Sequence, residues 1–334
     1  MVMIAAEGLG KTFRRPVVKE GAFAGVRSLF ARQYKETAAV ADVSFTIERG
    51  EFVGYIGPNG AGKSTTIKML TGILHPTAGE VRVAGRSPQR ERRHVAGRIG
   101  VVFGQRSQLW WDLPVRDSYD VLAAMYKVEP DVKRKRLAEL TELLRLDEVM
   151  DLPVRKCSLG QRMRADLAAA LLHDPDVLFL DEPTIGLDAF AKRSIREFLR
   201  SLNREFGKTI LLTTHDMDDI ETLCSRVMVL NGGALAYDGS LEELRERIGL
   251  PSRMTLTFAG DVDAAACAAA FGDEVAVERA DGPRVALAFQ RERIRPKRVL
   301  DAASALGDIV DIHMEEPEFE DVIRRIYSGA TNDR

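Results

Sequence analysis

The glycine-rich run GPNGAGKS at residues 57–64 is the feature that most restricts how this chain can fold. It fits the spacing G-x-x-x-x-G-K-[ST], which needs a strand before it and a helix after it. Residues 52–56 form an apolar run typical of a buried strand, and residues 64–74 place apolar side chains three and four apart, as an amphipathic helix does. The glycines let backbone N–H groups turn toward an anion, and the positive end of the helix faces the same point. The sequence therefore predicts an α/β fold around a phosphate-binding loop.

The side chains of this loop suit a nucleoside triphosphate and a magnesium ion. Lys63 can reach the β- and γ-phosphates, and the Ser64 hydroxyl can bind Mg²⁺. The competing interpretation is a flexible glycine turn followed by a chance Lys-Ser pair, and the flanking strand and helix favour the phosphate loop. The residues expected to bind the nucleotide here are Gly57, Pro58, Asn59, Gly60, Ala61, Gly62, Lys63, Ser64 and Thr65.

A second motif follows at residues 177–181, where the apolar run VLFLD ends in a carboxylate. Asp181 is expected to hold Mg²⁺, directly or through water. Glu182 comes next and is placed to orient or deprotonate the attacking water. An Asp-Glu pair after a strand can also be a solvated turn, but a phosphate loop upstream favours the metal and water roles.

Composition narrows the class of protein. Hydrophobic residues make up 45% of the 334 residues and charged residues 29%, an ordinary globular balance, and the net charge of −2 gives no global signal for nucleic acid. The three cysteines, Cys157, Cys224 and Cys267, share no CxxC spacing, which argues against a zinc site and fits a reducing compartment. We find no signal-peptide pattern and no apolar stretch of the ~20 residues that a bilayer span needs.

Between the two motifs lies CSLGQR, residues 157–162. Ser158, Gly160 and Gln161 match the L-S-x-G-Q signature, and on this ground the chain resembles the nucleotide-binding subunit of an ABC transporter over about residues 3–245. The resemblance implies a P-loop NTPase cassette with a RecA-like core, an antiparallel β subdomain and a helical subdomain. Cys157 stands where leucine is usual, but cysteine is also a small hydrophobe, so we expect function to survive.

The resemblance assigns roles to four further residues. Gln105 resembles the Q-loop glutamine, which senses the γ-phosphate and Mg²⁺. Asp188 in IGLD resembles the D-loop aspartate, and His215 in TTHD resembles the switch histidine. Phe13 is the candidate for the aromatic ring that stacks on adenine, with a core phenylalanine as the alternative.

The resemblance also implies a mechanism. Two cassettes pair head to tail, so Ser158 and the backbone at Gly160 contact the γ-phosphate of the ATP held by the partner copy. Glu182 and His215 then assist in-line attack by water, while Lys63, Gln105 and Mg²⁺ complete the catalytic set. ATP closes the dimer and hydrolysis reopens it. Since the chain has one set of motifs, its partner is a second copy or a related subunit.

Residues 14–37 and the C-terminal tail extend beyond a minimal cassette, and the segment just past the Q-loop carries two tryptophans. Residues 14–37 can form a basic amphipathic helix, with Phe23, Val26 and Phe30 on one face, that lies on lipid headgroups or on a loop of the permease. The alternative is a helix that packs on its own domain. In SQLWWDLP, Trp110 and Trp111 either anchor a membrane subunit or pack against the helical subdomain. The tail resembles the extension found on cassettes of the ABC-2 exporter group, either as a dimer brace or regulator or as a stabilising appendage.

We therefore expect an ABC ATP-binding domain at residues 1–248, with the insertion at 14–37 and the helical subdomain and signature at 106–160, and a small α+β accessory domain at 251–334. The expected function is ATP hydrolysis for an ABC-2 type exporter. The expected ligands are ATP and Mg²⁺, and the expected partner is a separately encoded multi-span permease at the cytoplasmic face of the cell membrane, with no nucleic acid.

Two other classes of protein fit the sequence less well. A soluble ABC ATPase acting on ribosomes or nucleic acid usually carries two motif sets, or a long insertion between the phosphate loop and the signature. A kinase or GTPase outside the ABC class would lack CSLGQR, IGLD and TTHD in this order. Neither class matches the chain as well as the transporter subunit does.

Overall fold

The computed structural model describes residues 1–16, 34–104, 106–291, 293–315 and 319–327. The chain divides into two compact units, Met1–Ser240 and Leu241–Arg334. The helix α9 (Leu241–Ile248) is grouped with the second unit, whereas the sequence interpretation assigned it to the first.

A six-stranded sheet forms the centre of the first unit, in the order β5-β6-β7-β3-β8-β9. Neighbouring strands are parallel except β9, which pairs antiparallel with β8. Central strands of such a sheet are covered on both faces, which explains their unbroken apolar runs. The strands are β3 (Phe52–Ile56), β5 (Ile99–Phe103), β6 (Val177–Asp181), β7 (Thr209–Thr213), β8 (Arg226–Asn231) and β9 (Ala234–Ser240).

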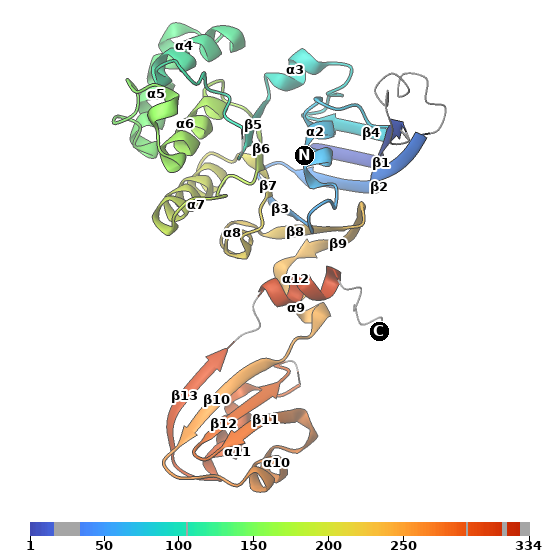
Figure 1. The fold of residues 1–334 in the computed structure, drawn as a ribbon, viewed down its shortest axis with the longest axis vertical. Helices are drawn as coiled ribbons and strands as arrows, with labels where there is room; N and C mark the ends of the chain where they lie inside the picture. The colour runs from blue at the N-terminus through green and yellow to red at the C-terminus, as the bar shows by residue number, and fades with distance from the viewer. Residues whose placement is uncertain (17–33, 105, 292, 316–318, 328–334) are drawn as a thin grey trace, which may run out of the picture. The chain divides into compact units, whose positions relative to one another are not determined.

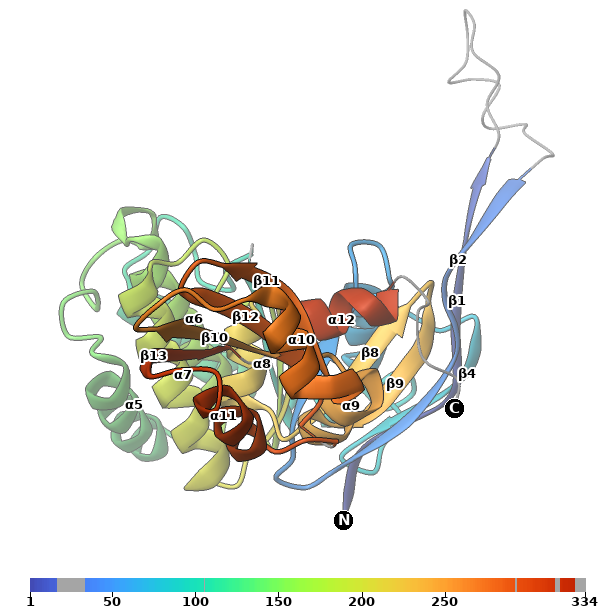
Figure 2. The same ribbon diagram turned by 90° about the horizontal axis from the view of Figure 1, so that it is seen from below.

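A three-stranded antiparallel sheet in the order β2-β1-β4 packs on the same core. Its strands are β1 (Val2–Pro16), β2 (Tyr34–Glu48) and β4 (Ala78–Val83), and Figure 2 shows β1 and β2 side by side as two long strands. One apolar cluster joins both sheets around α2 (Lys63–Leu70), with Ile67 and Leu70 fully buried in it. The ends of the 14–37 insertion therefore lie in strands, and its predicted helix face lies outside the described residues.

Three helices lie on the β5 side of the sheet in Figure 1; the first two fall in the predicted helical segment, and the third begins at the signature and extends past its predicted end at residue 160. They are α4 (Val115–Tyr126), α5 (Pro130–Leu144) and α6 (Leu159–Leu171), with the short 3₁₀ turn η1 (Val154–Lys156) before α6. The buried Tyr119 hydroxyl donates to the Ala165 carbonyl at 3.1 Å, which ties α4 to α6. The short α3 (Arg92–Ala96) precedes β5.

Two further helices follow the central strands. α7 (Ala189–Arg204) comes after β6, and α8 (Met217–Leu223) comes after β7. The sequence interpretation anticipated α8 but contained no prediction for α7.

The second unit is an antiparallel four-stranded sheet in the order β11-β12-β10-β13. Its chain order is strand, helix, strand, strand, helix, strand, which with this strand order gives a ferredoxin-like topology. Sequence reasoning found β10 (Ser252–Phe258), β12 (Arg284–Phe289), α10 (Ala264–Phe271) and α12 (Phe319–Tyr327) but missed β11 (Val275–Asp281), β13 (Ile309–Glu315) and α11 (Pro296–Ser304). A 3₁₀ turn, η2 (Gly272–Glu274), precedes β11. None of the helices among the described residues is long and apolar enough to cross a membrane.

Arg226 connects the two sheets of the first unit. It makes a two-point contact with Asp238 in β9, at 2.6 Å and 2.8 Å, and its Nη1 donates to the Thr46 carbonyl in β2 at 3.0 Å. Nη1 also lies 3.3 Å from Glu51. A planar guanidinium can make these contacts together, whereas an ammonium group cannot.

We predict that Arg226→Ala lowers the free energy of unfolding by about 2 kcal/mol, since several charge-assisted hydrogen bonds are lost. Arg226→Lys should recover less than half of this. Urea unfolding gives both values. The matched control is Arg82→Ala, because Arg82 is 66% exposed and 3.9 Å from Glu80, and it should change stability by less than ~0.5 kcal/mol. Full recovery in the lysine variant would contradict the proposed geometry.

Candidate functional site

Two glycines of the phosphate loop are fixed by neighbouring strands. Gly62 has φ of 105° at the start of α2, and a Cβ atom there would lie 2.4 Å from the Ala39 carbonyl oxygen of β2. A Cβ at Gly57 would lie 2.6 Å from the Leu230 carbonyl oxygen of β8. No side chain fits at these distances, so the loop needs glycine at both positions.

Lys63 is almost fully buried inside this loop. Its Nζ donates to the Gly57 carbonyl at 2.6 Å and to the Pro58 carbonyl at 3.2 Å. Burial lowers the pKa of Lys63, while the nearby charges of Glu182 and Asp181 oppose that change. The loop thus positions an ammonium group beside its own backbone, where an anionic phosphate would restore favourable charge pairing.

Asp181 ends β6 beside the phosphate loop. The hydroxyls of Ser64 and Thr213 lie 3.3 Å and 2.6 Å from its Oδ1 atom, and both donate to it. A serine hydroxyl beside a carboxylate is the kind of oxygen pair that Mg²⁺ accepts in phosphoryl-transfer sites. The predicted metal residues Ser64 and Asp181 therefore meet in space, and Thr213 is an addition that its place in TTHD could have suggested.

Glu182 and His215 are in direct contact. His215 Nε2 lies 2.7 Å from Glu182 Oε1, and the histidine side chain is 46% exposed. Glu182 has φ of 58°, a left-handed conformation uncommon for a residue other than glycine. Its N–H donates to the Thr213 carbonyl at 2.9 Å, and a Cβ at Gly104 would lie 2.1 Å from its carbonyl oxygen. Strain of this kind is typical of functional positions that surrounding structure holds in place.

A cavity of about 380 Å³ lies beside this cluster. Sequence reasoning had predicted three of its lining residues, Ser64, Asp181 and Glu182, but it did not predict the cations Lys68 and Arg106. The lining residues are Ser64, Lys68, Ile73, Phe103, Gly104, Arg106, Asp181 and Glu182. Carboxylates and cations therefore line the same cavity at the carboxyl edge of the sheet.

The signature residues begin helix α6. The Gln161 N–H donates to Ser158 Oγ at 3.2 Å, and the Ser158 N–H donates to Gln161 Oε1 at 2.9 Å, which forms a capping box. Ser158 is exposed. A Cβ at Gly160 would lie 3.2 Å from Ala191 Cβ, so Gly160 permits close packing against α7. Asp188 caps α7 by accepting from the Ala191 N–H at 2.8 Å.

Three other predictions have different outcomes. Gln105 lies outside the described residues. Phe13 lies in β1, is 38% exposed, and has Lys11 Nζ 5.4 Å from its ring centroid, so it is not a core residue and its adenine contact stays a prediction. Trp110 and Trp111 are 39% and 53% exposed, with the Arg162 guanidinium 5.6 Å from the Trp111 ring.

A buried carboxylate that sequence reasoning missed connects the segment after Gln105 to α6. Asp166 is 5% exposed, and its Oδ1 accepts from Ser107 Oγ at 2.9 Å and from the Gln108 N–H at 3.0 Å. Burial raises the pKa of Asp166 to about 6, against these hydrogen bonds and the charge of Arg162. An isolated Asp in a helix sequence gives no signal for such a contact.

The raised pKa of Asp166 predicts that the free energy of unfolding depends on pH, and Asp166→Asn should remove this dependence. Because the folded-state pKa is raised, the folded chain binds the proton more tightly, and this stabilisation is complete below pH ~4 and lost as pH rises through ~6. Relative to Asp166→Asn, wild type should lose on the order of 3 kcal/mol of unfolding free energy between pH 4 and pH 7. Urea unfolding across this range measures the difference, and parallel curves for the two proteins would contradict it.

The fold and this cluster define the chain as a P-loop ATPase of the cassette type. The family model described as ABC transporter matches residues 40–185. The chain is 36% identical over 217 residues to the ABC transporter ATP-binding protein NatA of Bacillus subtilis, covering 65% of this chain and 88% of that protein. It is 42% identical over 215 residues to the Nod factor export ATP-binding protein I of Burkholderia pseudomallei, covering 64% of this chain and 70% of that protein.

Solved structures agree with this relationship. The dimeric cassette MJ0796, in a post-hydrolysis state bound to ADP and Pi, has a TM-score of 0.60 at 27% identity, covering 72% of this chain and 99% of that one. CbiO1 of Clostridium perfringens, part of the ABC transporter complex cbiONQ, also has a TM-score of 0.60 at 27% identity, covering 73% and 91%. The chain belongs to the ABC transporter family and is one of its ATPase subunits, which confirms the predicted fold class and family.

Proposed function

We propose that this chain is the Mg²⁺-dependent ATPase of an ABC-2 type exporter and drives a separately encoded permease from the cytoplasmic face of the membrane. The observation that carries the proposal is the meeting of Lys63, Ser64, Asp181, Glu182 and His215 at one edge of the sheet. The relatives named for Nod factor export support the exporter assignment.

Each residue of this cluster has a role in the proposed reaction. Lys63 binds the β- and γ-phosphates in the loop, and Ser64 and Asp181 supply the oxygen ligands for Mg²⁺, which offsets charge on the phosphates when bound. Glu182 orients the attacking water and accepts its proton. His215 holds Glu182 in place and lies on the side of the site where the γ-phosphate binds. The 2.7 Å contact supports a shared role for Glu182 and His215.

The signature at the start of α6 is proposed to act in the partner copy. Ser158 is exposed and caps the start of α6, so an anion brought to this point meets the Ser158 hydroxyl and the positive end of the helix. Head-to-tail pairing would bring the ATP of one copy to this point on the other. The dimeric relative in its ADP and Pi state supports this arrangement.

The permease is proposed to dock where apolar side chains are exposed after the Q-loop segment. Trp110, Trp111 and Leu113 are exposed there, and Met125 at the end of α4 is 67% exposed. Aromatic side chains contribute strongly to protein interfaces, and exposed tryptophans on a surface commonly mark such contacts.

We predict that Glu182→Gln binds ATP, accumulates as a closed dimer, and hydrolyses ATP about 10²-fold or more slowly, since a general base is lost. Steady-state ATPase assays and size-exclusion chromatography with ATP measure both effects. Ser158→Arg in the same background is the control, because it leaves the phosphate loop intact but blocks the partner's γ-phosphate. Normal turnover in Glu182→Gln would remove Glu182 from this role, and ATP-driven dimers surviving Ser158→Arg would contradict head-to-tail pairing.

We also predict that tagged Glu182→Gln protein, purified with ATP from detergent-solubilised cells, retains a multi-span membrane protein. Trp111→Asp should reduce that recovery, because a charge replaces an exposed ring of the proposed docking surface. Mass spectrometry identifies what is retained, and ATP binding by the variant shows that it is folded. Recovery of ribosomal proteins or nucleic-acid-bound factors without a membrane protein would contradict the transporter assignment.

A further inference from the structure

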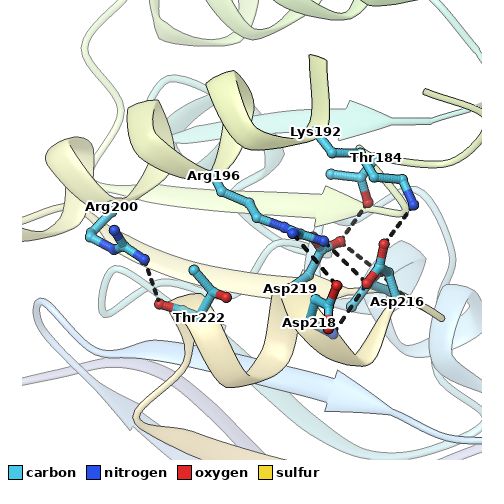
Figure 3. A network of polar contacts seen from close by, with 9 residues as sticks. Thr184, Lys192, Arg196, Arg200, Asp216, Asp218, Asp219 and Thr222 are labelled. Atoms are coloured by element: carbon cyan, nitrogen blue, oxygen red, sulfur yellow. Dashed lines mark hydrogen bonds and ion pairs between the residues drawn. The ribbon is translucent and has the colours of Figure 1, made fainter. Parts of the chain in front are cut away.

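A fully buried carboxylate outside the proposed mechanism gathers hydrogen bonds next to the catalytic pair. Asp219, in the first turn of α8, has no exposed surface. Its Oδ2 accepts from Thr184 Oγ1 at 2.5 Å and from Thr214 Oγ1 at 2.9 Å, and its Oδ1 accepts from Arg196 Nε at 2.5 Å. Figure 3 shows Thr184 and Arg196 converging on this side chain from different elements.

Two of these donors belong to the loops that carry the proposed catalytic residues. Thr184 lies two positions after Glu182, and Thr214 immediately precedes His215. Both hydroxyls bind the same oxygen of Asp219, so the carboxylate fixes the distance between the two loops. The same two loops carry Glu182 and His215, whose side chains are 2.7 Å apart.

The third donor comes from α7, the helix that begins at the D-loop. Arg196 also forms an ion pair with Asp216, with Nη2 3.1 Å from Oδ1, and Lys192 Nζ donates to Asp216 Oδ2 at 2.6 Å. Lys192 and Arg196 are one helical turn apart, and Figure 3 shows both reaching toward α8. Because Asp188 caps α7, a shift of the D-loop moves both cations together.

The charges in this network resist movement of α7 relative to α8 and the two loops. Burial would raise the pKa of Asp216, but the hydrogen bond from Lys192 and the charges of Arg196 and Lys192 lower it. Asp219 is buried completely, and removing a partner from a buried charge is costly, so the three segments cannot separate freely. Such a network transmits a displacement of α7 to both loops rather than absorbing it.

We propose that Asp219 is a positioning residue that holds His215 against Glu182 and links both to the position of α7. Contact with a partner copy at Asp188 then changes the positions of Glu182 and His215 through Arg196 and Asp219. Hydrolysis becomes fast only when the D-loop is seated in the closed dimer. This inference rests on the function proposed above for Glu182 and His215.

The test uses the full-length chain and the variant Asp219→Asn, which keeps the size of the side chain but removes its charge. We expect kcat for ATP hydrolysis to fall about tenfold or more, because the catalytic pair is displaced, while the Kd for ATP stays within about twofold. The matched control is Asp218→Asn on the same helical turn. Asp218 is 76% exposed and 3.9 Å from Arg196, and its variant should leave both values within about twofold.

A double-mutant cycle with His215→Ala separates positioning from general stability. If Asp219 acts through His215, adding Asp219→Asn to His215→Ala should lower kcat by less than about twofold further. A full additional loss in the double variant would overturn the inference. So would a loss of ATP binding, parallel to the loss of kcat, in an Asp219→Asn protein that is folded.

A milder variant covers the case in which Asp219→Asn fails to fold. Thr214→Val removes one donor to Asp219 without changing side-chain size, and it should lower kcat about threefold or more with ATP binding retained. A wild-type rate in Thr214→Val would overturn the inference. An unchanged rate in His215→Ala would instead overturn the role of His215 in the proposed function, whereas a slow His215→Ala beside a fast Asp219→Asn would overturn the coupling alone.

Discussion

The parallel pairing of β6, β7 and β3 is the constraint on which the site depends. Asp181 pairs with Thr213 across β6 and β7, and Gly54 pairs with Leu212 across β7 and β3. This register brings the carboxyl ends of three strands to one edge, although the segments that follow them are far apart in the chain. A slip of one residue would turn every side chain of a strand to the opposite face, so the site exists only in this register.

The parts of the site that sequence alone predicted have a strong local pattern. The strand at residues 52–56 and the strand ending at Asp181 were predicted because buried parallel strands are continuously apolar. The loop between β3 and α2 was predicted because its glycine spacing is a local sequence pattern. The structure adds the reason for two of these glycines, since β2 and β8 leave no room for a side chain at Gly62 and Gly57. Lys63, Ser64, Asp181, Glu182 and His215 then came together as the motifs implied.

The parts that sequence reasoning missed depend on contacts between distant segments. α7 went unpredicted although it carries Lys192 and Arg196, and Asp219 is hydrogen-bonded to Thr184, 35 residues earlier in the chain. Asp166 likewise is hydrogen-bonded to a loop 59 residues away, and its burial, which raises its pKa, is not visible in the local sequence. In the second unit, β11 and β13 are largely exposed strands, so neither has the clear apolar alternation that identifies a strand.

The capping box at Ser158 limits which residues can stand there. Ser158 Oγ accepts a hydrogen bond from the start of its own helix, and its hydroxyl proton is still available to a phosphate oxygen. An aspartate would cap the helix equally well but would repel the phosphate, and an alanine would neither cap nor donate. The hydroxyl is also oriented before any nucleotide arrives, so little conformational entropy is lost on contact. Natural variation at this position is therefore expected to stay within the small hydroxyl residues.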